Sequence, residues 1–270
     1  MTAPKEIRSK YTEVMPNVYE LVPNEEYHAS DGLSKTTICQ IHESIALYQM
    51  MKASPQKPTD PMVKGSAFHD LVLLPEEYKK NYLVGPTKGK ATKAHKKCVL
   101  DHPHKTVITS GVSNDIYSMR DALYNNPSIK KILGQKTTLR EVSIWVKDPI
   151  TGLTLKVRPD LVSDGVIYDL KSTIAPHSRA FLHSVYKYNY NVQSALYQDV
   201  ALMNGMKITN FVFLVVGSKP PFLTAIYDIN LELLQEGRDK YREALERYSN
   251  YLLSSDKWNG LSYGRETVTL

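Results

Sequence analysis

The chain has 270 residues, of which 42% are hydrophobic and 23% are charged, and this ordinary globular composition excludes disordered, collagen-like and coiled-coil proteins. The longest apolar run, residues 211–216, is far too short to span a membrane, and the first ten residues lack an apolar signal core. Two widely separated cysteines exclude a zinc ribbon and a four-cysteine iron–sulfur cluster. We therefore expect a soluble, cytoplasmic protein.

Positive charge is concentrated in one segment, residues 79–105. The whole chain carries 34 Lys and Arg against 28 Asp and Glu, a net charge of +6. The segment has eight lysines and one acid, so it carries +7 and the remainder carries −1. This concentration favours a polyanionic partner, nucleic acid first, although a solvated lysine-rich loop is the alternative. The candidate DNA contacts are Lys88, Lys90, Lys93, Lys96 and Lys97.

The first half of the chain has the pattern of helices. Residues 1–26 form a polar N-terminal segment, and residues 27–138 form a mainly helical part in which the lysine-rich segment is partly irregular. Caps and apolar residues at spacings of three and four predict helices at residues 34–48, 60–73 and 112–125.

From residue 139 the pattern changes to alternating and β-branched residues. We predict one α/β domain, with a central mixed β-sheet flanked by helices and an N-terminal helical portion. Residues 139–229 form the sheet core with the active site, and residues 230–270 form a C-terminal helix and tail. Strands are predicted at residues 141–147, 153–162, 166–172, 211–216 and 223–229, and helices at residues 177–204 and 231–253.

One predicted hairpin brings two acids together. Asp164-Gly165 is a favoured pair for a two-residue type I′ turn, so opposed residues have numbers summing to 329 and Asp160 faces Asp169. Two carboxylates ~5 Å apart repel by about 3 kcal/mol at an effective dielectric of about 20. Lys171, on the same face, offsets part of this repulsion. A divalent cation with oxygen ligands, magnesium or manganese, offsets more.

Such a site suits phosphodiester hydrolysis. A metal on Asp160 and Asp169 neutralises charge on the phosphate and lowers the pKa of a bound water. Lys171 orients that water or, with its pKa lowered by burial, takes its proton. The alternative is a surface hairpin whose acids merely face solvent.

The residues of this hairpin resemble those of a known nuclease group. Pro159-Asp160 followed by Asp169-x-Lys171 resembles the motif of the PD-(D/E)XK nuclease superfamily. From Tyr27 onward, the order of further segments is similar to that in the nuclease domain of exonuclease VIII, the RecE-type recombination exonucleases. These segments are YHASDGLSKTTI, KGSAFHDLVLLPEEY, VRPDLV, YDLKST and YNVQSALYQ.

The resemblance implies a restriction-endonuclease-like core and a set of site residues. The metal site that it implies comprises His69, Asp160, Asp169 and Lys171. A lone helical histidine is otherwise more often a core residue. We add two candidate ligands, the backbone carbonyl of Leu170 and the carboxylate of Glu141, which begins the first predicted strand; a surface acid is equally plausible for the latter.

Two further residues share one helical face. Gln193 and Tyr197 are spaced i and i+4. The resemblance implies that this face lines the active site, with Gln193 hydrogen-bonding DNA or the attacking water. The alternative is a polar residue beside a packing tyrosine. Ser34 and Lys35 open the first predicted helix, where free N–H groups and a basic side chain favour a phosphate, although simple capping explains Ser34 as well.

The resemblance also implies the activity and its partners. It implies 5′-3′ degradation of one strand of linear double-stranded DNA with Mg²⁺, for which Mn²⁺ substitutes, leaving 3′ single-stranded tails. The implied partners are DNA ends, a single-strand annealing protein of RecT type and further copies of the chain in a ring-shaped homo-oligomer, in a bacterial cell that carries a phage or prophage. The alternatives are an endonuclease of restriction or junction-resolving type and a non-catalytic DNA-end-binding module.

Overall fold

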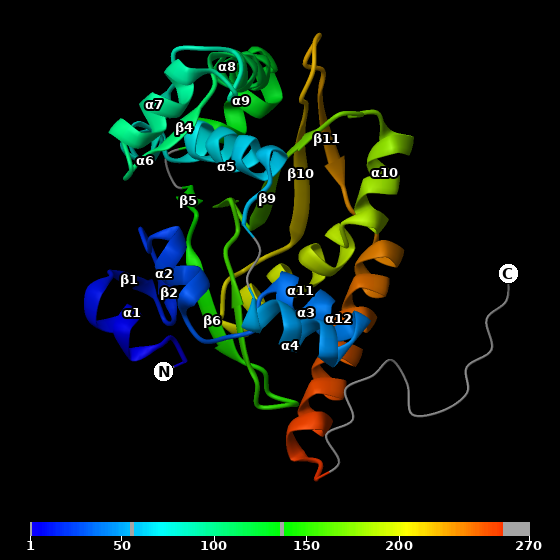
Figure 1. The fold of residues 1–270 in the computed structure, drawn as a ribbon. Coiled ribbons are helices and arrows are strands. Elements are labelled where there is room, and N and C mark those ends of the chain that lie inside the picture. The colour runs from blue at the N-terminus through cyan, green and yellow to red at the C-terminus, as the bar shows by residue number, and fades with distance from the viewer. Residues whose placement is uncertain (1, 55–56, 136–137, 256–270) are drawn as a thin grey trace, which may run out of the picture.

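The strands form two main sheets, and a bent hairpin made of β5 to β8 contributes strands to both of them. The computed structural model describes residues 2–54, 57–135 and 138–255 (Figure 1). The five-stranded sheet has the order β11-β10-β9-β8-β5, in which β9 and β10 are parallel and the other pairs antiparallel, so the predicted mixed sheet is confirmed. Its strands are β5 (Leu139–Arg140), β8 (Leu161–Ser163), β9 (Val166–Thr173), β10 (Asn210–Gly217) and β11 (Thr224–Asp228).

The second sheet is four-stranded and antiparallel, in the order β1-β2-β6-β7. Its strands are β1 (Glu13–Met15), β2 (Val18–Tyr19), β6 (Ser143–Lys147) and β7 (Thr154–Val157). The strand predicted at residues 141–147 is present as β6, which begins two residues later, but the prediction of one continuous strand at residues 153–162 was wrong. Glu141 adopts a left-handed conformation with φ 48° between β5 and β6, and Pro159, which lacks an N–H, interrupts the chain between β7 and β8. The chain therefore crosses between the sheets at two neighbouring points.

The first 26 residues were predicted to form only a polar segment, and this prediction was incomplete. They form α1 (Lys5–Lys10), β1, β2 and the start of α2 (Asn24–Ala29). Tyr19, Tyr27 and Trp145 pack there in a small core, with ring centroids 5.8 and 5.9 Å from Trp145. The burial that orders this segment thus comes from a tryptophan on β6, more than a hundred residues further along the chain.

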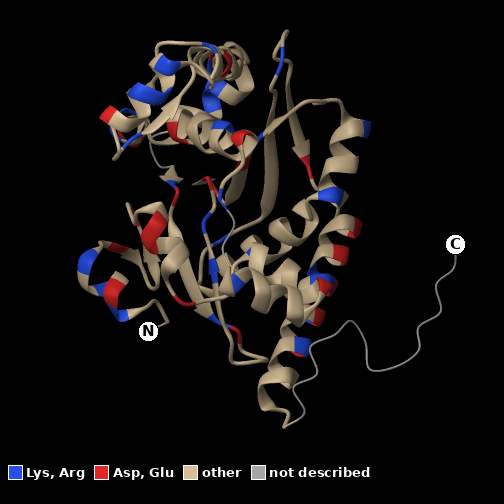
Figure 2. Ribbon diagram, in the orientation of Figure 1, with Lys and Arg blue, Asp and Glu red and all other residues tan. Residues whose placement is uncertain are grey.

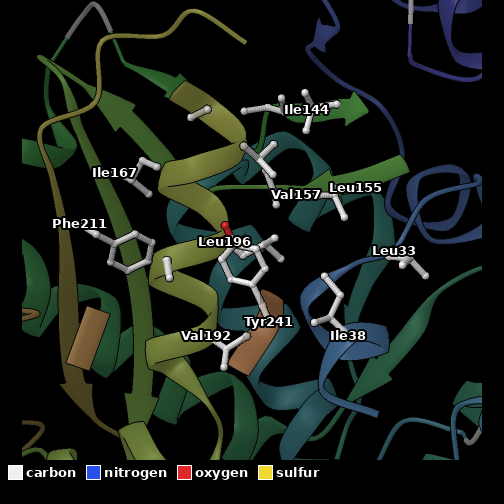
Figure 3. Packing of buried hydrophobic residues seen from close by; sticks show 14 of the residues in the cluster. Leu33, Ile38, Ile144, Leu155, Val157, Ile167, Val192, Leu196, Phe211 and Tyr241 are labelled. Carbon is white, nitrogen blue, oxygen red and sulfur yellow. The ribbon is translucent and has the colours of Figure 1, made fainter. Parts of the chain in front are cut away.

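Helices cover both faces of the five-stranded sheet. Alternate residues of β10, from Phe211 to Val216, pack against opposite faces, which explains the uninterrupted apolar run. Figure 3 shows one of these cores, in which α3, α11 and α12 meet the sheets. The helices on this side are α3 (Lys35–Glu43), α4 (Ile45–Ala53), α10 (Ser178–Lys187), α11 (Tyr190–Met203) and α12 (Leu231–Leu253).

The predicted helix at residues 34–48 is in fact two helices. Ser44 has extended backbone, with φ −164°, and its side chain accepts a hydrogen bond from the Leu47 N–H, so it ends α3 and caps α4. The apolar spacing continues across the break because both helices pack on the same core, and the pattern therefore concealed it.

The opposite face of the sheet is covered by the helical part around α5 (Asp60–Leu73) and α8 (Ser110–Asn125). The lysine-rich segment lies in this part, and Figure 2 shows its positive charge there. The other elements of this part are α6 (Pro75–Asn81), α7 (Lys93–Asp101), α9 (Pro127–Leu133) and the parallel pair β3 (Tyr82–Val84) and β4 (Thr106–Ile108). Within the described ranges, no helix is both long and apolar enough to cross a membrane.

Candidate active site at the joint between the two sheets

The hairpin of β8 and β9 has the predicted register. Val162 pairs with Ile167 and Ser163 with Val166, so paired numbers sum to 329. Asp164 and Gly165 have φ of 49° and 77°, as a type I′ turn requires. The backbone N–H of Leu170 donates to Asp160 Oδ2 at 2.6 Å. Asp160 therefore stands beside β9, at the level of Asp169 and Leu170.

Three side chains converge at the point where the chain crosses between the sheets. The ligand atoms of His69, Glu141 and Asp160 all lie within 4.8 Å of one another, and His69 Nδ1 is 3.4 Å from Asp160 Oδ2. His69 comes from α5, Glu141 from the break between β5 and β6, and Asp160 from the break between β7 and β8. The Glu141 N–H donates to the Asp160 carbonyl at 3.1 Å, so the two breaks are joined directly.

The two close carboxyl groups of this cluster favour the binding of a cation. Burial, and then the Asp160 carboxylate, raise the pKa of Glu141 to about 8. Burial and the neighbouring Asp169 raise the pKa of Asp160 well above its ordinary value. Burial lowers the pKa of His69, which keeps its imidazole neutral, the form that binds metals. Without a cation, both carboxyl groups therefore hold protons more tightly than usual.

The donor set fits a hard divalent cation. Two carboxylates and a neutral imidazole suit Mg²⁺ or Mn²⁺, and a site without thiolates is not a structural zinc site. Asp169 Oδ2 adds a further buried acidic oxygen, which lies 2.5 Å from Lys171 Nζ. The protein residues that would hold a metal are thus His69, Glu141 and Asp160, with Asp169 adjacent.

Asp169 belongs first to a second group, with Lys171 and Gln193. Asp169 Oδ1 accepts a hydrogen bond from Gln193 Nε2 at 2.6 Å, and Gln193 Oε1 accepts one from Lys171 Nζ at 3.2 Å. Burial lowers the pKa of Lys171, but the carboxylates of Asp169 and Asp160 outweigh it and raise that pKa above its ordinary value. The expectation that Lys171 has a lowered pKa was therefore wrong, whereas its role in taking a proton stays a prediction. The lysine is an ammonium group that pairs with Asp169.

The remaining predicted site residues lie around these two groups. Tyr197 lies beside Glu141 and Asp160, and burial raises its pKa well above the ordinary value, so it remains a phenol that can donate a hydrogen bond. Leu170 is buried in β9, where its N–H contacts Asp160. A ligand role for its carbonyl stays a prediction.

A small cavity opens on the metal-ligand side. This cavity, here the terminal cavity, has a volume of about 440 Å³ and is lined by His69, Glu141, Asp160 and Tyr197. Arg140 and Arg158 also line it, and neither forms an ion pair with any described carboxylate.

Arg158 is held in place by several contacts. Its Nη2 donates to the Val22 carbonyl at 2.9 Å and to Ser143 Oγ at 2.7 Å, and its guanidinium carbon lies 4.1 Å from the centre of the Tyr27 ring. Sequence reasoning missed this arginine, although it directly precedes Pro159-Asp160.

A larger cavity opens on the Lys171 side. This cavity, here the wide groove, has a volume of about 1160 Å³ and runs between α5, the end of β9 and α10. Cationic side chains outnumber the two acids, Asp60 and Asp115, along it. These cationic residues are Lys64, Lys171, Arg179, Lys187 and Lys219. Sequence reasoning found only Lys171 among them, because the others are scattered along the chain.

Ser34 and Lys35 lie near the second group of site residues. Ser34 forms a capping box with Thr37, so its hydroxyl is used as an N-cap. Lys35 Nζ donates to the Tyr188 carbonyl and lies 5.9 Å from the centre of the Tyr190 ring, the same ring that Lys171 faces at 4.6 Å. A DNA contact of either residue remains a prediction.

The predicted DNA-contacting lysines lie apart from these groups. Lys90 pairs with Asp60 at 2.6 Å, and both it and Lys88 line a hollow beside α5. All five of these lysines are exposed, and those other than Lys90 form no ion pair with the acids of the described residues. Lys93, Lys96 and Lys97 lie on α7.

Comparison with known families identifies the fold. A family model described as "PDDEXK-like domain of unknown function (DUF3799)" matches residues 33–259. The chain belongs to this PDDEXK-like family. The resemblance to the PD-(D/E)XK superfamily noted in the hairpin is thereby confirmed. A search of curated protein sequences finds no match.

One solved structure has a similar fold, and a second matches less closely. A proposed exonuclease from Eubacterium rectale has a TM-score of 0.60 at 15% identity, over 86% of this chain and 88% of that one. An alkaline exonuclease from Laribacter hongkongensis has a TM-score of 0.32 at 10% identity, over 82% of this chain and 91% of that one. The first of these likenesses supports the PDDEXK-like architecture.

Proposed function

We propose that this PDDEXK-like protein is a metal-dependent deoxyribonuclease that degrades linear double-stranded DNA from an end. The observation that carries the proposal is that two groups of partly or fully buried side chains lie next to each other. His69, Glu141 and Asp160 form an acidic cluster suited to a divalent cation, and Asp169 with Lys171 adjoins it. An acidic metal cluster beside a lysine ammonium is suited to phosphodiester hydrolysis.

Each residue of the candidate site has its own role in such a reaction. A divalent cation held by His69, Glu141 and Asp160 would supply neutralising charge and would lower the pKa of a water molecule. Lys171, which is an ammonium group, binds a phosphate oxygen or orients the attacking water. Gln193 holds both Lys171 and Asp169 in place, since it bonds to both. Tyr197 and Arg158 line the terminal cavity and can donate hydrogen bonds to a phosphate there.

The shapes of the two cavities support attack at a DNA end. The terminal cavity, at about 440 Å³, is in the size range of a small-molecule site. The wide groove is larger, at about 1160 Å³. The acidic cluster lines the smaller cavity, so one strand separated from its partner reaches it most simply from an end. The Eubacterium rectale relative, described as a proposed exonuclease, is in keeping with this mode.

The finer features of the proposal are supported by the resemblance to exonuclease VIII alone. They are 5′-3′ polarity, 3′ tails for recombination by strand annealing, Mg²⁺ as the metal, with Mn²⁺ as a substitute, a ring-shaped homo-oligomer and an annealing partner of RecT type. Light scattering after gel filtration tests the oligomer. Its expected result is a particle of at least three chains.

One digestion separates the activities. Linear and closed circular duplexes, labelled at either the 5′ or the 3′ end and with or without a 5′ phosphate, are incubated with Mg²⁺ or EDTA. An end-directed 5′-3′ exonuclease degrades only linear DNA and releases the 5′ label first. Asp160→Asn is the matched inactive control. Cleavage of the circular DNA would instead indicate an endonuclease, and binding without cleavage an end-binding module.

A further inference from the structure

One face of α5 lines both cavities in succession. Met62 lines the wide groove, Gly65 and Ser66 line the terminal cavity, and His69 reaches the acidic cluster. Residues at spacings of three and four share one face of a helix, so these residues form a continuous row. The wide groove and the terminal cavity share no lining residue, but they lie one after the other along this row, with Gly65 on the side of the terminal cavity.

Gly65 has no role that the folded protein itself requires. It lies inside a 14-residue helix, where glycine is less favourable than alanine. Its φ is not in the left-handed region, and a Cβ added there would meet no atom of the described residues within 4 Å. Gly237 differs, because a Cβ on it would lie 2.2 Å from the Asn191 carbonyl oxygen. Packing thus explains Gly237 but does not explain Gly65.

The surroundings of Gly65 suit a nucleic-acid backbone. Ser66 is exposed and offers a hydroxyl, and Lys64 lies on the side of the wide groove, where Nζ is 2.5 Å from Asp115 Oδ2. Arg140 and Arg158 line the terminal cavity beyond. The row on α5 therefore leads from the cationic wide groove to a cavity that is lined by two arginines and by the acidic cluster. A glycine allows a ligand backbone to approach closely at this point.

We propose that a single DNA strand crosses α5 over Gly65 on its way from the wide groove to the terminal cavity. This inference rests on the proposed nuclease function. Gly65 is then a specificity-determining residue, because the passage that it leaves open admits one strand. A side chain at this position narrows the passage at the wall of the terminal cavity.

Two substitutions and one control test this crossing. Gly65→Ala and Gly65→Leu are compared with Gly111→Ala, a glycine of α8 whose added Cβ would lie 3.8 Å from Thr109 Oγ1 and which lines neither cavity. Each protein is assayed on a linear duplex and on the p-nitrophenyl ester of thymidine 5′-phosphate. The small ester reaches the acidic cluster without crossing α5.

The expected results separate the crossing from the chemistry. Gly65→Ala raises the melting temperature by roughly 2 °C, because alanine favours the helix and nothing opposes its methyl group. Gly65→Leu cleaves the duplex at least about tenfold more slowly, and its loss of activity on the small ester is smaller. Gly111→Ala cleaves both substrates normally.

Other results overturn the crossing in recognisable ways. Wild-type duplex cleavage by Gly65→Leu shows that no strand passes there, and it leaves the nuclease function intact. An equal loss on both substrates places Gly65 at the acidic cluster rather than on a path. A lower melting temperature of Gly65→Ala shows that the space is not free. A wild-type protein that cleaves no DNA refutes the proposed function itself.

Discussion

Gln193 donates a hydrogen bond from Nε2 to Asp169 Oδ1 at 2.6 Å, and its Oε1 accepts one from Lys171 at 3.2 Å. One residue of α11 thus sets the positions of two side chains that project from β9. The amide can do this because it carries both a donor and an acceptor, which neither a carboxylate nor an ammonium group has. The spacing between α11 and β9 therefore determines whether Gln193 can reach both side chains.

Gln193→Ala should slow DNA cleavage by about tenfold to a hundredfold, because Lys171 and Asp169 lose the group that orients them. DNA affinity should stay at the wild-type value, since Gln193 is buried. Single-turnover cleavage and a binding titration in EDTA measure the two quantities. Gln235→Ala, at an exposed position of α12, is the control. Normal cleavage by Gln193→Ala would remove this residue from the site.

Glu141→Gln should raise the melting temperature in EDTA, because it removes a buried acid that repels Asp160. The same substitution should abolish most of the increase in melting temperature that Mn²⁺ gives the wild type, because a ligand is lost. Thermal melts with EDTA and with Mn²⁺ provide both values, and Glu232→Gln on the exposed start of α12 is the control. An undiminished effect of Mn²⁺ would place the metal elsewhere.

The affinity for Mn²⁺ should rise with pH and level off above about pH 8. The pKa of Glu141 is raised to about 8, so below that pH a metal must displace its proton, whereas above it the carboxylate is already free. Isothermal titration calorimetry at pH 6.5, 7.5 and 8.5 measures the trend. In Glu141→Gln the trend should be flatter. An affinity that is independent of pH would contradict this assignment.

Replacing Lys93, Lys96 and Lys97 together by alanine should weaken DNA binding and flatten its salt dependence. Each lysine that contacts a phosphate contributes about 0.9 to the slope of log K against log salt. Binding titrations between low and physiological salt measure the slope. The matched control replaces three exposed lysines elsewhere, namely Lys5, Lys147 and Lys207. Equal slopes would show that the α7 lysines are only a solvated surface.

Gly237→Ala should destabilise the fold by about 1–3 kcal/mol, since its methyl group would overlap the Asn191 carbonyl and push α12 away from α11. Because α11 carries Gln193, cleavage should fall as well. Urea unfolding measures the free energy of unfolding, and Gly111→Ala is the control. A stability equal to that of the wild type would show that the two helices adjust without strain.

Local rules predicted the parts of the fold in which neighbouring residues decide the structure. The register of β8 and β9 followed from Asp164-Gly165, because a two-residue turn leaves one antiparallel pairing. The bounds of α12 matched the predicted helix at residues 231–253, because Asn230 caps a long amphipathic pattern. The position of Asp160 beside β9 needed no other information.

The rest depended on contacts between distant segments. The left-handed conformation of Glu141 arises where two sheets meet, and nothing in the alternating pattern around it indicates a break. The bonding of Asp169 to Gln193 depends on how α11 packs against β9. The first 26 residues fold because their apolar side chains pack around Trp145, which lies far away in the sequence. Arg158 was missed because its partners, Val22, Tyr27 and Ser143, come from three separate segments.

The hydrogen bond between the Glu141 N–H and the Asp160 carbonyl has a mechanical consequence. The two acids are borne by adjoining points of the backbone, so a tilt of either sheet moves both together and leaves their separation unchanged. Insertions at the far edges of the sheets, for example beyond β1 or β11, should therefore leave the distance between Glu141 and Asp160 unchanged. Of the three residues, only His69 lies on a helix, α5, which covers one face of the sheet. A movement of α5 would therefore change the distance from His69 to the two acids.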